Sequence, residues 1–316
     1  MKGAKNKLYI TAGVLAATLI AIIICSVAMM ESYDALSGYY AHGAALPTVF
    51  NVICIVAALA IIGVSLFVLP KGEAIPPMRD KLCRLLAIPP VAALIYISFE
   101  RFEALSNTVF YGGFGKELLS PLFSALLPIL SAIFFITICA GLKRNALTAL
   151  SGVLTIFFML FEIYKSYTDM TVAMNTPVKI LFYFAALSTA LFVLAEMRIA
   201  WGDKAHSKTS YMSQYLAVLL TGVYSLPIMI WILAQGAGIA AFSLFFFTIF
   251  LLSCARVITI ALVKDTPAEE VEEIEAEITE ETEETTEITE EVEVEVEVEV
   301  EVETEETQTD EEQKEN

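Results

Sequence analysis

The amino-acid sequence predicts an all-α membrane protein, an eight-transmembrane-helix bundle followed by a disordered acidic C-terminal tail. The first observation is apolar content: 57% of the 316 residues are hydrophobic and the mean hydropathy is +0.69, more than a soluble core requires. The second is the distribution of charge. Residues 1–264 hold 18 basic and 11 acidic residues, net +7, whereas residues 265–316 hold one basic and 26 acidic residues, net −25. The chain therefore divides at Lys264.

Eight apolar segments within residues 1–264 are long enough to cross a bilayer. A hydrocarbon core about 30 Å thick needs about 20 residues of helix. Continuous apolar runs of this length satisfy their backbone hydrogen bonds as helices and not as strands of a barrel. The predicted spans are approximately 8–30, 47–69, 83–104, 119–141, 147–168, 177–199, 211–234 and 238–263.

Prolines predict irregularities in three of these spans. Pro89 and Pro90 lie together in the third span, Pro128 lies in the fourth and Pro227 in the seventh. Each proline lacks the backbone N–H that a helix uses, so a kink or a break is expected at these positions.

Positive charge predicts the orientation, because cytoplasmic loops retain Lys and Arg. One side of the predicted bundle receives 14 basic residues, from the N-terminal MKGAKNK, the 70–84 loop and the ends that follow the fourth, sixth and eighth spans. The other side receives only Arg101, Lys116, Lys165 and Lys179. We therefore expect a bacterial plasma membrane location with both the N-terminus and the C-terminus in the cytoplasm.

The first span has an alternative interpretation as a cleaved signal peptide. Residues 26–28, Ser-Val-Ala, are small enough for a signal peptidase, but the apolar stretch exceeds the usual length of about 7–15 residues. A lipoprotein anchor at Cys25 is disfavoured by Ile24 before it. A retained span is expected, and cleavage would leave seven helices with the other orientations unchanged.

Few residues are suited to cofactor, metal or covalent chemistry. The five cysteines are scattered singly and the two histidines are expected on opposite sides of the membrane. Phosphate loops, nucleophile elbows, zinc helices and EF-hand spacings are absent from the sequence. We therefore expect no cofactor, no metal, no catalytic residue and no nucleic-acid partner. A membrane-embedded enzyme ranks third among the possible functions, because a paired nucleophile and base is missing.

Charged residues near the spans are the candidate functional residues, since a charge at the bilayer centre costs about 2.5 kcal/mol or more. Glu100, Glu103 and Glu162 are all expected toward the outer face. One hypothesis is an outward-facing acidic site for a cation, a proton or an amine, formed as these carboxylates converge. The alternative is structural: Glu100 and Arg101 extend to the interface while Glu162 pairs with Lys165.

A second group of charges is expected to be structural. Glu196 and Arg198 end the sixth span, and Arg256 lies within the eighth. Opposite charges on the sixth and eighth spans predict an inter-helix ion pair, whose expected role is to lock the helices together.

The start of the sixth span carries a resemblance. In MNTPVK, residues 174–179, Thr176 can cap a helix and Pro177 can take its first position. The longer stretch MNTPVKILFYFAALSTALFVLAEMR, residues 174–198, resembles uncharacterised multi-pass membrane proteins of anaerobic Gram-positive bacteria. The resemblance covers one helix and its capping turn, and implies a bacterial plasma membrane but no activity.

The tail, residues 265–316, is a Glu/Val/Thr-rich low-complexity segment. It has no aromatic residue and extreme charge, which predicts disorder. Residues 291–303 alternate Glu and Val and would form an amphipathic strand only with a partner, because the glutamates repel one another. That partner is either a basic cytoplasmic protein or the basic cytoplasmic loops of the chain itself. The remaining interpretation is a solvating spacer.

These features predict a polytopic integral membrane protein in contact with the lipid bilayer, with a transport or permease-type component as the first hypothesis for its function. The alternative is a non-enzymatic membrane scaffold or sensor that uses its acidic tail to bind a basic cytoplasmic partner.

Overall fold

The computed structural model describes residues 2–35, 37–69, 75–112, 118–169, 173, 176–203, 205–238 and 240–262. These residues belong to one compact unit, Met1–Val263. The predictions for the tail, residues 265–316, lie outside the described residues.

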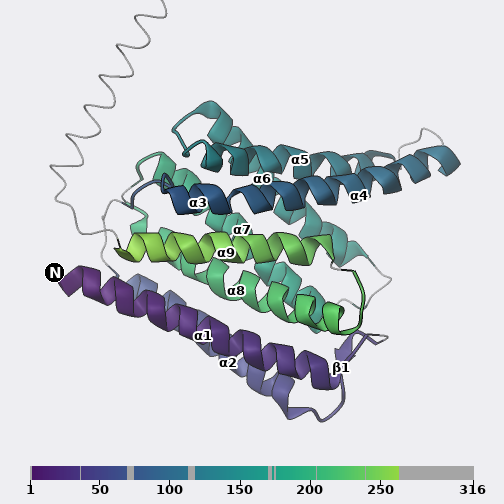
Figure 1. Ribbon diagram of the computed structural model, residues 1–316, viewed down its shortest axis with the longest axis horizontal. Coiled ribbons are helices and arrows are strands. Elements are labelled where there is room, and N and C mark those ends of the chain that lie inside the picture. The colour runs from purple at the N-terminus through teal and green to yellow at the C-terminus, as the bar shows by residue number, and fades with distance from the viewer. Residues whose placement is uncertain are drawn as a thin grey trace, which may run out of the picture. The chain divides into compact units, whose positions relative to one another are not determined.

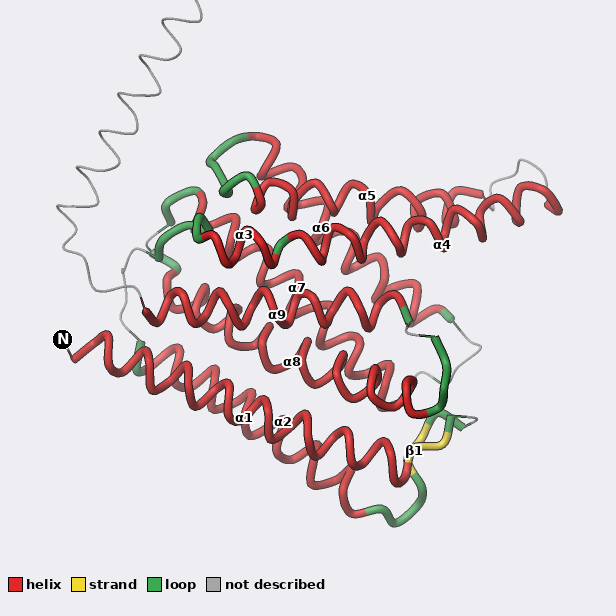
Figure 2. The backbone as a smooth tube through the Cα atoms, in the orientation of Figure 1, coloured by secondary structure: helices red, strands yellow, loops and turns green. Residues whose placement is uncertain are grey.

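The described residues form a helical membrane protein, which confirms the predicted fold class. Eight helical stretches are long and apolar enough to cross a membrane, and the third of them, Lys81–Asn107, includes both α3 and most of α4. Helices account for nearly all of the backbone in Figure 2. The helices are α1 (Lys2–Ser32), α2 (Ala45–Phe67), α3 (Lys81–Leu86), α4 (Ile88–Gly112), α5 (Leu119–Cys139), α6 (Ala146–Thr168), α7 (Pro177–Ala200), α8 (Ser207–Ala234) and α9 (Ala241–Leu262).

The helix ends and interruptions follow local chemistry. The third span breaks between α3 and α4, just before Pro89 and Pro90, whereas α5 continues through Pro128 and α8 through Pro227. The side chain of Asn145 caps α6 by accepting a hydrogen bond from the backbone N–H of Thr148, at 2.8 Å. Pro177 takes the first position of α7, although the side chain of the preceding Thr176 forms no capping hydrogen bond.

A two-stranded hairpin connects α1 to α2. Strands β1 (Tyr33–Asp34) and β2 (Tyr39–Tyr40) pair antiparallel, with Tyr33 opposite Tyr40. The ring of Tyr33 meets that of Trp231 on α8 edge-on, at 5.3 Å between centroids. Burial raises the pKa of the Tyr33 and Tyr40 hydroxyls above the usual value for tyrosine. The hairpin therefore attaches the α1–α2 pair to the rest of the unit by apolar contact.

Six helices form a closed cycle of neighbours. Each helix from α4 to α9 packs against the next, and α9 packs back against α4. Helix α1 packs on α8 and α9, and α2 packs on α1 and α8. The α1–α2 pair consequently lies on the side of the bundle away from α5, as Figure 1 shows.

Aromatic side chains from several helices meet on one part of α9. The rings on α9 are those of Phe242, Phe245 and Phe246. They pack against one ring from each of four other helices: Phe135 of α5, Phe158 of α6, Phe182 of α7 and Tyr224 of α8. Their ring centroids lie 5.1–6.3 Å apart, the range of favourable aromatic pairs. The cycle of helices is thus filled by ring packing at this level.

Gly222 allows α8 to approach α9 and α1 closely. A Cβ atom at Gly222 would lie 2.8 Å from the ring of Phe250 and 3.2 Å from Ile22. We expect Gly222→Val to cost about 1–3 kcal/mol of stability through overpacking, measured as a lower midpoint of thermal unfolding in detergent. Gly63→Val is the matched control, because a Cβ at Gly63 meets no atom within 4 Å. Equal midpoints for the two variants would contradict this packing.

Candidate functional site

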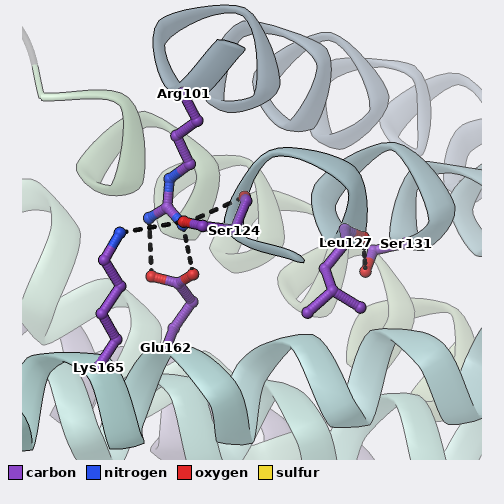
Figure 3. A network of polar contacts seen from close by, with 6 residues as sticks. All are labelled: Arg101, Ser124, Leu127, Ser131, Glu162 and Lys165. Carbon is purple, nitrogen blue, oxygen red and sulfur yellow. Dashed lines mark hydrogen bonds and ion pairs between the residues drawn. The ribbon is translucent and has the colours of Figure 1, made fainter. Parts of the chain in front are cut away.

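An ion pair joins α4 to α6. The guanidinium of Arg101 donates two hydrogen bonds to the carboxylate of Glu162, at 2.5 Å to Oε1 and 2.7 Å to Oε2. The two side chains are only 15% and 5% exposed. Figure 3 shows the fork of the guanidinium facing both carboxylate oxygens. This bidentate geometry gives the pair both direction and strength.

Ser124 and Lys165 extend this pair into a network. Ser124 of α5 accepts hydrogen bonds from Arg101 on its backbone carbonyl, at 3.3 Å, and on its hydroxyl. The ammonium of Lys165 on α6 donates to the same hydroxyl, at 3.0 Å. Arg101 also lies over the ring of Phe242 on α9, 5.1 Å from its centroid. We call Arg101, Ser124, Glu162 and Lys165 the Arg101 network.

The structure places the three predicted acidic residues differently from one another. Glu162 is buried within the Arg101 network, whereas Glu100 and Glu103 are exposed on α4. Neither of these two forms a hydrogen bond or ion pair with Glu162 among the described contacts. Adjacent positions on a helix are about 100° apart, so the face that presents Arg101 to α6 turns Glu100 away.

A second ion pair joins α7 to α9. Nε of Arg256 donates to Oε1 of Glu196, at 2.8 Å, and Nη2 donates to the backbone carbonyl of Pro76, at 2.7 Å. The amide of Gln214 on α8 donates to the same oxygen of Glu196. Both charged side chains are 0% exposed. We call Glu196, Gln214 and Arg256 the Arg256 network.

The Arg256 network has spare hydrogen-bonding capacity. Oε2 of Glu196, Oε1 of Gln214 and Nη1 of Arg256 are buried and have no hydrogen-bond partner among the residues that the structure describes. One donor and two acceptors can together bind a small polar group. Arg198, the third residue of the predicted pair, is half-buried on α7 and makes no hydrogen bond or ion pair with Glu196 or Arg256 among the described contacts.

The two networks occupy corresponding places in two three-span units, the first unit being the third to fifth spans (α3–α6) and the second the sixth to eighth spans (α7–α9). In each unit a charge lies late in the first span, a hydrogen-bonding side chain lies within the first two turns of the second, and the opposite charge lies late in the third. Arg101 and Glu196 lie 20 and 19 residues after the first residues of their spans. Ser124 and Gln214 lie 5 and 7 residues after the first residues of theirs, and Glu162 and Arg256 lie 16 and 15 residues after theirs.

Sequence reasoning did not find every partner. Ser124, Gln214 and the carbonyl of Pro76 were not among the candidates. Gln214 had a usable signal, since it is an uncharged polar residue within the apolar seventh span and such residues hydrogen-bond between membrane helices. The carbonyl of Pro76 had none, because any backbone could have supplied it.

Among the described residues, no group of three or more His, Cys, Asp or Glu side chains is placed to hold a metal ion. Comparisons with protein-family models, with curated proteins and with solved structures gave no match. The chain is a multi-pass helical membrane protein whose function is inferred from the chemistry of its bundle.

Proposed function

We propose that this protein is a transport or permease-type component, in which the first and second three-span units move against each other to carry a small polar solute across the bilayer. The observation that carries the proposal is the pair of buried, matched charge networks, one in each unit. Ionisable residues inside membrane spans are costly and rare, and solute and ion pathways are among the places where they are retained.

The matched positions imply opposite ends of the bundle. Successive spans alternate in direction, so three spans separate α4 from α7 and reverse the orientation of the unit. Arg101 packs on Phe242 of α9, and Arg256 lies 14 residues further along the same helix, which is about 20 Å at 1.5 Å per residue. Inverted units of this kind, with the solute path at their interface, are a recurrent construction of transporters.

Helix contacts and turns support the same correspondence. In this correspondence α4, α5 and α6 are equivalent to α7, α8 and α9. The α4–α5 contact then corresponds to α7–α8, the α5–α6 contact to α8–α9, and the α4–α9 contact to α6–α7, and all six contacts are present. The segments 140–145 and 235–240, which join the second and third spans of each unit, have equal length. Each begins with a helix cap followed by a glycine of positive φ, Gly141 and Gly236.

The boundary between the units is suited to movement. Most directional bonds of each charge network lie within its own unit, which favours motion of the unit as a rigid body; in addition, Arg256 donates to the carbonyl of Pro76 before α3, and Arg101 lies over Phe242 of α9. Rings such as Phe158 of α6 and Phe242 of α9 pack across the boundary, and apolar contacts are non-directional. Sliding along the boundary can therefore leave the ion pair of each network intact, at the cost of the hydrogen bond between Arg256 and the carbonyl of Pro76.

We further propose a bacterial plasma membrane with both termini cytoplasmic. The excess of Lys and Arg on one side of the spans supports this orientation, and the resemblance of residues 174–198 supports the bacterial source. The Arg101 network then lies toward the outside and the Arg256 network toward the cytoplasm.

Uptake by proteoliposomes tests the transport function. We expect the reconstituted full-length chain to take up acetate, methylamine or alanine, representing an anion, a cation and a zwitterion, faster than protein-free vesicles. Arg256→Lys keeps the charge but loses the planar fork, so we expect the uptake rate to fall by about 10- to 100-fold, as loss of a charged hydrogen bond of about 1.5–3 kcal/mol would produce. Arg198→Lys is the matched control and should keep the rate.

The scaffold alternative rests on the −25 charge of residues 265–316. One truncation distinguishes it from the transport function. Deleting these residues should spare uptake if the helices transport. If the tail is the working part, the deletion should instead abolish capture of a basic cytoplasmic protein while no uptake is seen with any of the three solutes.

A further inference from the structure

A cavity of about 220 Å³ lies between α1, α2 and α8, and none of its lining residues belongs to either charge network. Its depth comes from small residues on two helices: Gly13 and Ala17 on α1 face Ala57 and Ala60 on α2, and Tyr215 of α8 forms part of the wall. Larger side chains at these positions would fill the space between the helices. The chain instead keeps this space between three packed helices.

The wall of this cavity is almost wholly apolar. Apart from backbone atoms, its polar group is the hydroxyl of Tyr215, which is hydrogen-bonded to the hydroxyl of Thr11 at 3.0 Å. Water needs about 2–4 polar partners to occupy a buried site, and apolar cavities of comparable size stay dry and take up apolar molecules. The natural occupant is therefore apolar.

The residues around the opening of the cavity indicate which apolar group can enter it. The cavity is partly open, and α2 packs on α1 and α8 while its other faces are exposed. Val56 and Leu59, beside the lining residues of α2, are 60% and 62% exposed, as expected for side chains that face lipid in a membrane-spanning helix. The surface next to the opening is thus in contact with the hydrocarbon chains of lipids.

We propose that the cavity is a binding site for one acyl chain of a membrane phospholipid. An unfilled cavity leaves its lining without contacts on one side, and an acyl chain supplies them without desolvating a polar group. The bound chain acts as a wedge that couples the α1–α2 pair to α8 of the second unit. This site does not depend on the proposed transport function.

Photo-crosslinking tests the site. The full-length chain is reconstituted in vesicles of phosphatidylethanolamine and phosphatidylglycerol that contain a phospholipid with a diazirine on its acyl chain, and labelled peptides are mapped by mass spectrometry. We expect labelling of residues 10–17 and 57–64 in the wild type. Gly13→Phe should lower this labelling about tenfold, the factor that corresponds to losing the burial of about two methylene groups. A Cβ at Gly13 meets no atom within 4 Å, so the ring can enter the cavity without a clash at its base.

Gly63→Phe is the matched control, because Gly63 lies on α2 outside the lining and also has open space around its Cβ. It should leave the labelling unchanged. Ala57→Phe fills the cavity from the opposite wall and should reproduce the loss if Gly13→Phe fails to fold. Labelling that survives both cavity variants, or crosslinks from residues 10–17 to a second copy of the chain in place of lipid, would overturn the proposal.

Discussion

Replacing Arg256 by leucine is expected to lower the free energy of unfolding by about 3–5 kcal/mol, because it leaves the carboxylate of Glu196 charged and without its ion partner in the interior. Both side chains are 0% exposed, so water cannot take the place of the guanidinium. The same change removes the donor to the carbonyl of Pro76. Equilibrium unfolding in mixed detergent micelles measures the loss.

Two further variants show whether the loss comes from the ion pair. Arg198→Leu removes a neighbouring cation that is half-buried and outside the network, so its effect should stay within about 0.5 kcal/mol. Combining Glu196→Leu with Arg256→Leu removes both charges, and should recover most of the stability lost by either single change. Additive losses in the double variant would show that the two residues do not act as a pair.

Replacing Arg101 by leucine is expected to cost about 2–3 kcal/mol. The change leaves the Glu162 carboxylate, which is 5% exposed, without its ion partner. The loss is smaller than at Arg256, because Lys165 lies nearby and the partly exposed site admits some solvent. Arg101→Lys should recover less than half of it, since an ammonium cannot form the two parallel bonds of the guanidinium. The same unfolding experiment gives the measurement.

Lys165→Met provides the control for the Arg101 variants. Lys165 is exposed and donates to the hydroxyl of Ser124 rather than to Glu162, so its loss should cost less than about 1 kcal/mol. If Lys165→Met were as damaging as Arg101→Leu, Glu162 would depend on the lysine for its stability and the assignment of its partner would fail.

The spans could be predicted from sequence because crossing a bilayer imposes length and apolar content directly. A helix that spans hydrocarbon must be about 20 residues long, and the break before Pro89 follows from the missing donors of two adjacent prolines. The order in which the helices pack could not be predicted. Residues that face lipid and residues that face other helices are equally apolar in a membrane, so the pattern that identifies a buried face in a soluble helix is absent.

Partner choice within the site could be predicted only in part. An ion pair between helices was expected among Glu196, Arg198 and Arg256, because they place opposite charges in the sixth and eighth spans, and the structure pairs Glu196 with Arg256. For Glu162, the sequence favoured Lys165, one turn away, over Arg101, 61 residues away. The structure gives the carboxylate to Arg101, because the packing of α4 near α6 presents a planar guanidinium to both of its oxygens. Such a contact depends on tertiary packing that no local pattern records.

The most direct test of the proposed mechanism is the distance between the two units, measured at both ends of the bundle by pulsed electron spin resonance. Spin labels at Tyr167→Cys and Leu233→Cys report on one end, and labels at Leu147→Cys and Leu262→Cys report on the other, since all four side chains are exposed. The five native cysteines, which are free thiols, are first replaced.

We predict two distance populations for each label pair, with the transported solute shifting the two pairs in opposite directions, as rigid units that rock about a central interface require. A single distance at both ends, unchanged by any of the three solutes, would contradict the movement of the units and with it the proposed transport function.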